Sequence, residues 1–159
     1  MNMKILSAFA ALAMLSACSS TPTTTGAATG AGSTASTAGA APGSEEDLVA
    51  NVGDRVFYAF NEATLSGDAR GTLDRQAGWL QRYPSVQIQL AGNCDDRGTE
   101  EYNLALGQRR ANAARDYLVA RGVASSRIST ISYGKDRPVA QGDDEQAWAQ
   151  NRNAITAVR

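Results

Sequence analysis

Charged residues of both signs are concentrated in one stretch of the chain, GNCDDRGTEEYNLALGQRRA, at positions 92–111. Asp95, Asp96 and Arg97 lie in a glycine-bounded turn, after an alternating strand pattern and before a helical one. An Arg-Arg pair follows about four helical turns downstream. Carboxylates bind ammonium groups, and guanidinium groups bind carboxylates. The stretch therefore has the chemistry to bind a ligand that carries both charges.

Simpler interpretations are open for several of these residues. Adjacent residues usually point apart, which disfavours Asp95 and Asp96 as a pair for acid–base catalysis. An acidic turn before a helix is commonly a cap that also interacts with the helix dipole. Arg109 and Arg110 lie about 100° apart on a helix, so at most one can face a site formed by the preceding loop. We expect the other to be a solvated surface charge.

The residue types also exclude several classes of site. The sequence has no histidine and only two cysteines, which excludes His-dependent triads and the usual zinc sites. Cys94 could be a nucleophile, but without a histidine to activate it we expect a small, partly buried side chain. Trp79 and Trp148 are expected to pack in the protein rather than stack on a ligand. We predict no catalytic residue, no metal and no cofactor.

The first 17 residues have the features of a bacterial secretory signal. Lys4 precedes an apolar segment, residues 5–15, that is too short to span a bilayer. The signal ends in Leu-Ser-Ala-Cys, which resembles a lipobox in which Cys18 receives lipid and becomes the new N-terminus. An ordinary cleavage site is the alternative. Ser19, in place of an aspartate, favours the outer membrane by the same resemblance.

The remaining chain divides into a linker and a domain. Residues 18–44 are the lipidated cysteine and a Ser/Thr/Gly/Ala-rich segment without charge, which predicts a flexible tether. An acidic patch, Glu45-Glu46-Asp47, marks the start of a single domain, residues 45–159. With Lys4 removed alongside the signal, 14 basic and 16 acidic residues remain. This balance argues against nucleic-acid binding, which needs a basic surface.

The domain alternates between strand-like and helix-like patterns. Strands are predicted at residues 55–60, 86–90, 127–133 and 153–158, and helices at 65–80, from the central stretch to Gly122, and at 143–150. Gly122 fits a helix C-terminal cap. One face of the central helix is predicted to carry Leu104, Ala111, Ala114 and Leu118. The fold class is an α/β two-layer sandwich, with helices packed on a four-stranded mixed sheet.

Several motifs in order carry a resemblance to a known family. They are Arg-Gly-Thr at 97–99, Glu-Tyr-Asn at 101–103, Arg-Arg-Ala at 109–111, Ser-Tyr-Gly-Lys at 132–135, Arg-Pro at 137–138 and Asn-Arg at 151–152. With these, the chain resembles the OmpA-like peptidoglycan-binding domain family, and within it the peptidoglycan-associated lipoproteins of the Tol–Pal system. The resemblance runs from Val56 to the C-terminus and implies the βαβαβ(α)β order of that family.

The resemblance implies non-covalent binding of diaminopimelate in the peptidoglycan stem peptide. Asp95 would recognise the ammonium group of diaminopimelate, and Arg110 would bind a carboxylate through its planar fork. In the family the same pocket is lined at the positions of Asn61, Asn103, Gly98, Thr99, Leu65 and Leu106, with Arg152 as a weaker candidate. Four positions depart from the family pattern: Asn93 stands where histidine is frequent, Cys94 where threonine or alanine is usual, and Asp96 where glutamate is more usual, and Asn153 replaces the last arginine of Asn-Arg-Arg.

The same resemblance implies a lipoprotein of the outer membrane whose domain faces the periplasm and links the membrane to the cell wall. Its expected partners are peptidoglycan, the outer membrane and Tol proteins of the TolB and TolA types, which act in envelope constriction during cell division. Two other functions remain open. One is a cell-wall hydrolase using Asp95 or Cys94, and the other is a structural lipoprotein that only docks proteins.

Overall fold

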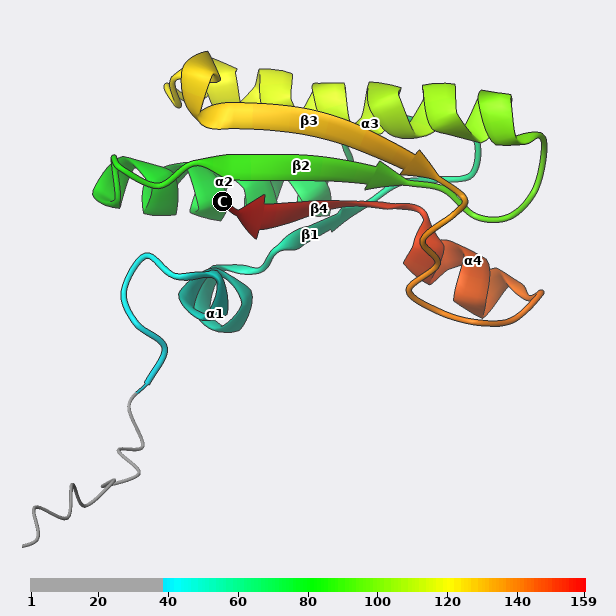
Figure 1. The fold of residues 1–159 in the computed structure, drawn as a ribbon, viewed down its shortest axis with the longest axis horizontal. Helices are drawn as coiled ribbons and strands as arrows, with labels where there is room; N and C mark the ends of the chain where they lie inside the picture. The colour runs from blue at the N-terminus through cyan, green and yellow to red at the C-terminus, as the bar shows by residue number, and fades with distance from the viewer. Residues whose placement is uncertain (1–38) are drawn as a thin grey trace, which may run out of the picture. The chain divides into compact units, whose positions relative to one another are not determined.

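The computed structural model describes residues 39–159, whose fold is shown in Figure 1. Four strands form a mixed sheet in the order β1-β4-β2-β3: β1 (Arg55–Phe57), β2 (Ile88–Asn93), β3 (Ile128–Gly134) and β4 (Asn153–Val158). β2 and β3 are parallel, whereas β4 is antiparallel to both β1 and β2. The signal, Cys18 and most of the linker lie outside the described residues.

Two long helices, α2 (Gly67–Arg82) and α3 (Glu100–Ala120), cover one face of this sheet (Figure 1). The shorter elements are α1 (Glu45–Asp47), which continues into a π-helical turn η1 (Leu48–Val52), the 3-10 turn η2 (Ser125–Arg127) and α4 (Glu145–Asn151). The predicted two-layer α/β fold with a four-stranded mixed sheet is therefore confirmed. Across residues 39–159, no helix is both long and apolar enough to cross a membrane.

The helices begin and end where the sequence supplies caps. The Ser66 side chain accepts a hydrogen bond from the Ala69 amide at the start of α2, and the Thr99 side chain does the same for Tyr102 at the start of α3. At the other end of α3, Gly122 has φ +93°. Its amide donates to Val119 and the amide of Val123 donates to Leu118, the paired bonds of a Schellman motif. The predicted C-terminal cap is confirmed.

Some predicted boundaries and faces are wrong. β1 ends at Phe57 rather than Phe60, and Leu65 precedes α2 instead of lying in it. Leu104 is 49% exposed, although the helical pattern assigned it to the buried face of α3. Polar side chains at Asn103 and Arg110 occupy that face, so the hydrophobic spacing misplaced it. The acidic patch that marks the predicted end of the tether, Glu45-Glu46-Asp47, forms helix α1, and the side chain of Asp47 is buried.

The Asp47 carboxylate fixes the start of the domain to helix α2. It accepts hydrogen bonds from the Gly43 amide (2.9 Å), Trp79 Nε1 (2.8 Å) and Asn51 Nδ2 (2.8 Å). These bonds favour the charged carboxylate and lower the pKa of Asp47, with the Gly43 amide as the largest cause. Trp79 is buried and meets Tyr83 edge to face, as expected of a packing residue.

Helix α3 approaches the sheet most closely at two glycines. A Cβ on Gly92 of β2 would lie 1.9 Å from the carbonyl oxygen of Gly107 in α3. A Cβ on Gly107 would lie 2.3 Å from Ser132 Oγ of β3 and 2.7 Å from the Gly92 carbonyl. Only glycine at both positions permits this contact, which holds the start of α3 against the end of β2.

We predict that Gly92→Ala lowers the free energy of unfolding by about 1–3 kcal/mol or more, because the added methyl group must push the backbones of β2 and α3 apart. Urea unfolding followed by circular dichroism measures this. Gly78→Ala on the exposed side of α2, where a Cβ meets nothing within 4 Å, is the control and should stabilise by about 0.5–1 kcal/mol. Equal effects of the two substitutions would contradict the close approach.

We predict that Asp47→Asn is destabilising at neutral pH and that its effect fades in acid. Because the folded-state pKa is lowered, the carboxylate contributes fully above its unfolded pKa of about 3.9, and the contribution is lost as pH falls through the folded value. Urea unfolding at pH about 7 and about 3 tests this. The control is Asp136→Asn, which changes an exposed carboxylate on a turn. Its effect on stability should not fade between the two pH values.

Candidate ligand-binding site

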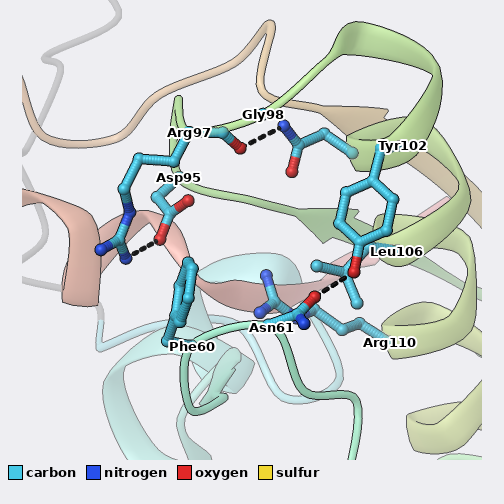
Figure 2. A pocket seen from close by; sticks show the side chains of 9 residues that line it. Phe60, Asn61, Asp95, Arg97, Gly98, Tyr102, Leu106 and Arg110 are labelled. Carbon is cyan, nitrogen blue, oxygen red and sulfur yellow. Dashed lines mark hydrogen bonds and ion pairs between the residues drawn. The ribbon is translucent and has the colours of Figure 1, made fainter.

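A pocket of about 200 Å³ opens where the loop after β1, the end of β2 and the start of α3 meet (Figure 2). Its lining combines charged, amide and aromatic side chains with one aliphatic group: Phe60, Asn61, Asp95, Arg97, Gly98, Tyr102, Asn103, Leu106 and Arg110. The pocket is small enough to suit one amino-acid-sized group.

The structure brings most of the predicted site residues together. Asp95, Arg110, Asn61, Asn103, Gly98 and Leu106 all line this pocket. Three others do not line it. Thr99 is the N-cap of α3, and Leu65 packs against the main core. Arg152 is not part of the lining, but it contacts Asp95.

Asp95 is the buried carboxylate of the pocket, at 4% exposure. One of its oxygens, Oδ2, accepts from Arg97 Nη2 at 2.5 Å and lies 3.4 Å from Arg152 Nη1. The pairing raises the pKa of Arg97, and the main cause is the hydrogen bond that Arg97 donates to Asp95. Asp95 does not cap α3, since Thr99 does. The neighbouring Asp96 is exposed and lies outside the lining.

Arg110 is fully buried and donates three hydrogen bonds to backbone carbonyls. Its Nε bonds to Glu62 (2.8 Å), its Nη1 to Asn93 (2.7 Å) and its Nη2 to Ala59 (3.1 Å). Burial lowers the pKa of Arg110, and burial also raises the pKa of Tyr58, whose ring lies 5.2 Å from the guanidinium. A guanidinium has five N–H donors, so two of them take no part in these three bonds.

Two asparagines shape the polar wall of the pocket. Asn61 has φ +59°, a left-handed conformation that asparagine adopts more readily than most residues, and its side chain accepts from the Tyr102 hydroxyl. Asn103 is buried and donates to the carbonyls of Arg97 (2.8 Å) and Thr99 (3.1 Å), which fixes the loop before α3. Figure 2 shows Asp95 and Arg97 facing Tyr102 across the pocket.

Sequence reasoning missed three residues of the lining: Phe60, Arg97 and Tyr102. Phe60 was assigned to a strand, yet it is 56% exposed at the rim. Arg97 was noted as a charge of the turn but given no role. A signal was available, because Arg97 and Tyr102 lie within the same motif-rich stretch as Asp95.

The remaining candidates have structural surroundings. Cys94 is buried at 3% exposure, its Sγ lies 3.3 Å from the Asn103 carbonyl, and burial raises the pKa of the thiol. Cys94 was expected to be partly buried, and the structure buries it more deeply than that. Arg109 is exposed, as expected for one member of the arginine pair. Asn93 and Asn153, two of the departures from the family pattern, contact each other through a 2.8 Å hydrogen bond. Among residues 39–159, no group of three His, Cys, Asp or Glu could hold a metal ion.

The chain matches the model of one protein family and is similar to individual proteins of known name. The model of the OmpA family matches residues 57–152. The peptidoglycan-associated lipoprotein of Rhizobium meliloti (strain 1021) is 53% identical over 128 residues, covering 80% of this chain and 73% of that protein. The peptidoglycan-associated lipoprotein of Mesorhizobium japonicum is 48% identical over 158 residues, covering 97% and 90%.

Solved structures show the same relationship. The crystal structure of the peptidoglycan-associated lipoprotein from Burkholderia pseudomallei superposes with a TM-score of 0.65 at 40% identity, covering 67% of this chain and 90% of that one. The C-terminal domain of Helicobacter pylori MotB has a TM-score of 0.61 at 24% identity, covering 65% and 81%, and shares the fold.

We predict that Arg110→Lys destabilises the domain by about 2–5 kcal/mol, because one ammonium cannot satisfy three separate carbonyls and buried carbonyls are left unpaired. Thermal or urea unfolding measures the loss. The matched control is the exposed neighbour, Arg109→Lys, expected to change stability by less than about 0.5 kcal/mol. An Arg110→Lys protein as stable as the parent would show that the buried bonds are dispensable.

Proposed function

Since the chain belongs to the OmpA family, and within it to the peptidoglycan-associated lipoproteins, we propose that it binds peptidoglycan non-covalently through diaminopimelate of the stem peptide. One observation carries the proposal: a buried carboxylate, Asp95, and a buried guanidinium, Arg110, line one small pocket. The free end of diaminopimelate offers an ammonium and a carboxylate. Each would meet the opposite charge in a desolvated site.

The shape of the pocket supports this assignment. Leu106 supplies an apolar wall for the methylene chain, while Asn61 and Asn103 supply amide groups at the polar end. Arg110 would use the N–H groups that its three backbone carbonyls leave free. The site lies between secondary-structure elements that buried hydrogen bonds tie together, so its charged groups are preorganised.

We further propose that the chain is anchored in the outer membrane and has no enzymatic activity. The proposed division is a signal peptide at 1–17, lipidated Cys18 with a linker to residue 44, and the binding domain at 45–159. Two or more acyl chains on Cys18 would anchor it stably. Tethering many copies beside a polymer would raise the avidity of a weak single pocket. Partnership with TolB and TolA during envelope constriction belongs to the same proposal.

We predict that Asp95→Asn weakens binding to diaminopimelate-type peptidoglycan by about 2–5 kcal/mol, because the ligand ammonium loses its buried counter-charge. Co-sedimentation of the purified chain with isolated peptidoglycan measures this, with circular dichroism to show that each variant is folded. The matched control, Asp96→Asn, changes an exposed neighbour outside the pocket and should bind like the parent.

Other outcomes point to different conclusions. If Asp95→Asn binds peptidoglycan as well as the parent, the chain binds the wall through a site other than this pocket. A folded parent that does not sediment with peptidoglycan would overturn the wall-binding proposal and favour a lipoprotein that docks only proteins. Release of soluble fragments from peptidoglycan would instead show a hydrolase.

A further inference from the structure

The guanidinium of Arg97 lies over two aromatic rings. Its Cζ is 4.0 Å from the centre of the Phe60 ring and 4.1 Å from that of the Trp148 ring. The three residues come from different parts of the chain: the segment after β1, the loop before α3, and helix α4. A cation over the face of an aromatic ring is attracted by the ring's quadrupole, so two such contacts restrict this long side chain.

The restricted guanidinium is aimed at the pocket carboxylate. Arg97 Nη2 and Arg152 Nη1 both approach the same oxygen of Asp95, Oδ2, at 2.5 and 3.4 Å. Figure 2 shows the other Asp95 oxygen turned away from Arg97, on the side of the pocket. Glu145 of α4 accepts from Arg152 at 2.6 Å and lies 3.9 Å from Arg97, which balances the two positive charges.

We propose that Trp148 is a positioning residue for ligand binding, acting through Arg97. By stacking on the guanidinium it keeps Arg97 on Oδ2, so that Asp95 presents its other oxygen to the pocket. Trp148 itself is not among the residues that line the pocket. The identity of the ligand, a group bearing an ammonium, rests on the function proposed above.

The geometry favours positioning over competition between Arg97 and the ligand. A free arginine on a loop could swing to either oxygen of Asp95 and would then compete with an ammonium. Contact with the two rings limits that freedom, because the guanidinium lies about 4 Å from the ring centres of both Phe60 and Trp148 while it donates a hydrogen bond to Oδ2. Helix α4 therefore contributes to the pocket without touching it.

The test compares two substitutions that both remove the indole. Trp148→Phe keeps a ring face for Arg97, whereas Trp148→Leu does not. With the full chain in detergent and isolated diaminopimelate-type peptidoglycan, we expect Phe to bind within about twofold of the parent and Leu to bind about tenfold more weakly. Trp79→Phe, in the core beside Asp47, is the structural control; it should lower thermal stability without weakening binding.

A measurement on the free protein separates this inference from the proposed function. In the parent and in Trp148→Phe, NMR should show an upfield ring-current shift of the Arg97 side-chain protons, and Trp148→Leu should lose most of it. The Asp95 carboxyl carbon resonance should move in Trp148→Leu only. The parent could show these signals and still fail to sediment with peptidoglycan. That result would support the positioning role and contradict the proposed ligand.

Three results would overturn the positioning role. The first is a Trp148→Leu protein that binds peptidoglycan as tightly as the parent, which leaves wall binding intact. The second is a parent without the upfield shift of Arg97, which would mean that the stack does not form in solution. The third is tighter binding by Arg97→Gln than by the parent, which would show that Arg97 competes with the ligand for Asp95.

Discussion

The buried guanidinium of Arg110 is the interaction on which the pocket depends. Its three hydrogen bonds end on carbonyls of Ala59 and Glu62, in the segment after β1, and of Asn93, at the end of β2. Since Arg110 belongs to α3, one side chain ties together every element that contributes to the lining. A charge with no exposed surface is tolerated here because backbone oxygens replace its hydration.

The close contact of Gly92 with Gly107 makes this arrangement possible. It lets α3 lie almost directly on β2, which places Arg110, one helical turn after Gly107, within reach of the Asn93 carbonyl. A larger residue at either glycine would move the helix outward and lengthen all three Arg110 bonds. Packing between two small residues thus sets the position of a charged group that itself organises the loops.

The sequence was sufficient for the fold and for most of the lining, and the errors have physical reasons. Alternation and helical spacing located the four strands and the helices α2, α3 and α4 of the described residues, because apolar side chains recur along these segments at strand or helix spacing. The pattern failed on α3, where Asn103 and Arg110 are buried and Leu104 is not. Burial of these polar residues depends on long-range partners such as the Asn93 carbonyl, which spacing along one helix cannot reveal. The stacking of Arg97 on Phe60 and Trp148 joins residues far apart in sequence and was invisible for the same reason.

Substitutions of Arg110 and of Asp95 would give different information about ligand binding. Arg110 holds three backbone segments, so a variant that loses wall binding could have lost a ligand contact or simply the shape of the pocket. Among residues 39–159, the Asp95 carboxylate bonds only to the side chains of Arg97 and Arg152, and asparagine preserves its size. Its substitution removes the negative charge while the loops keep their main-chain anchors. The carboxylate is therefore the group whose loss separates recognition of an ammonium from the integrity of the fold.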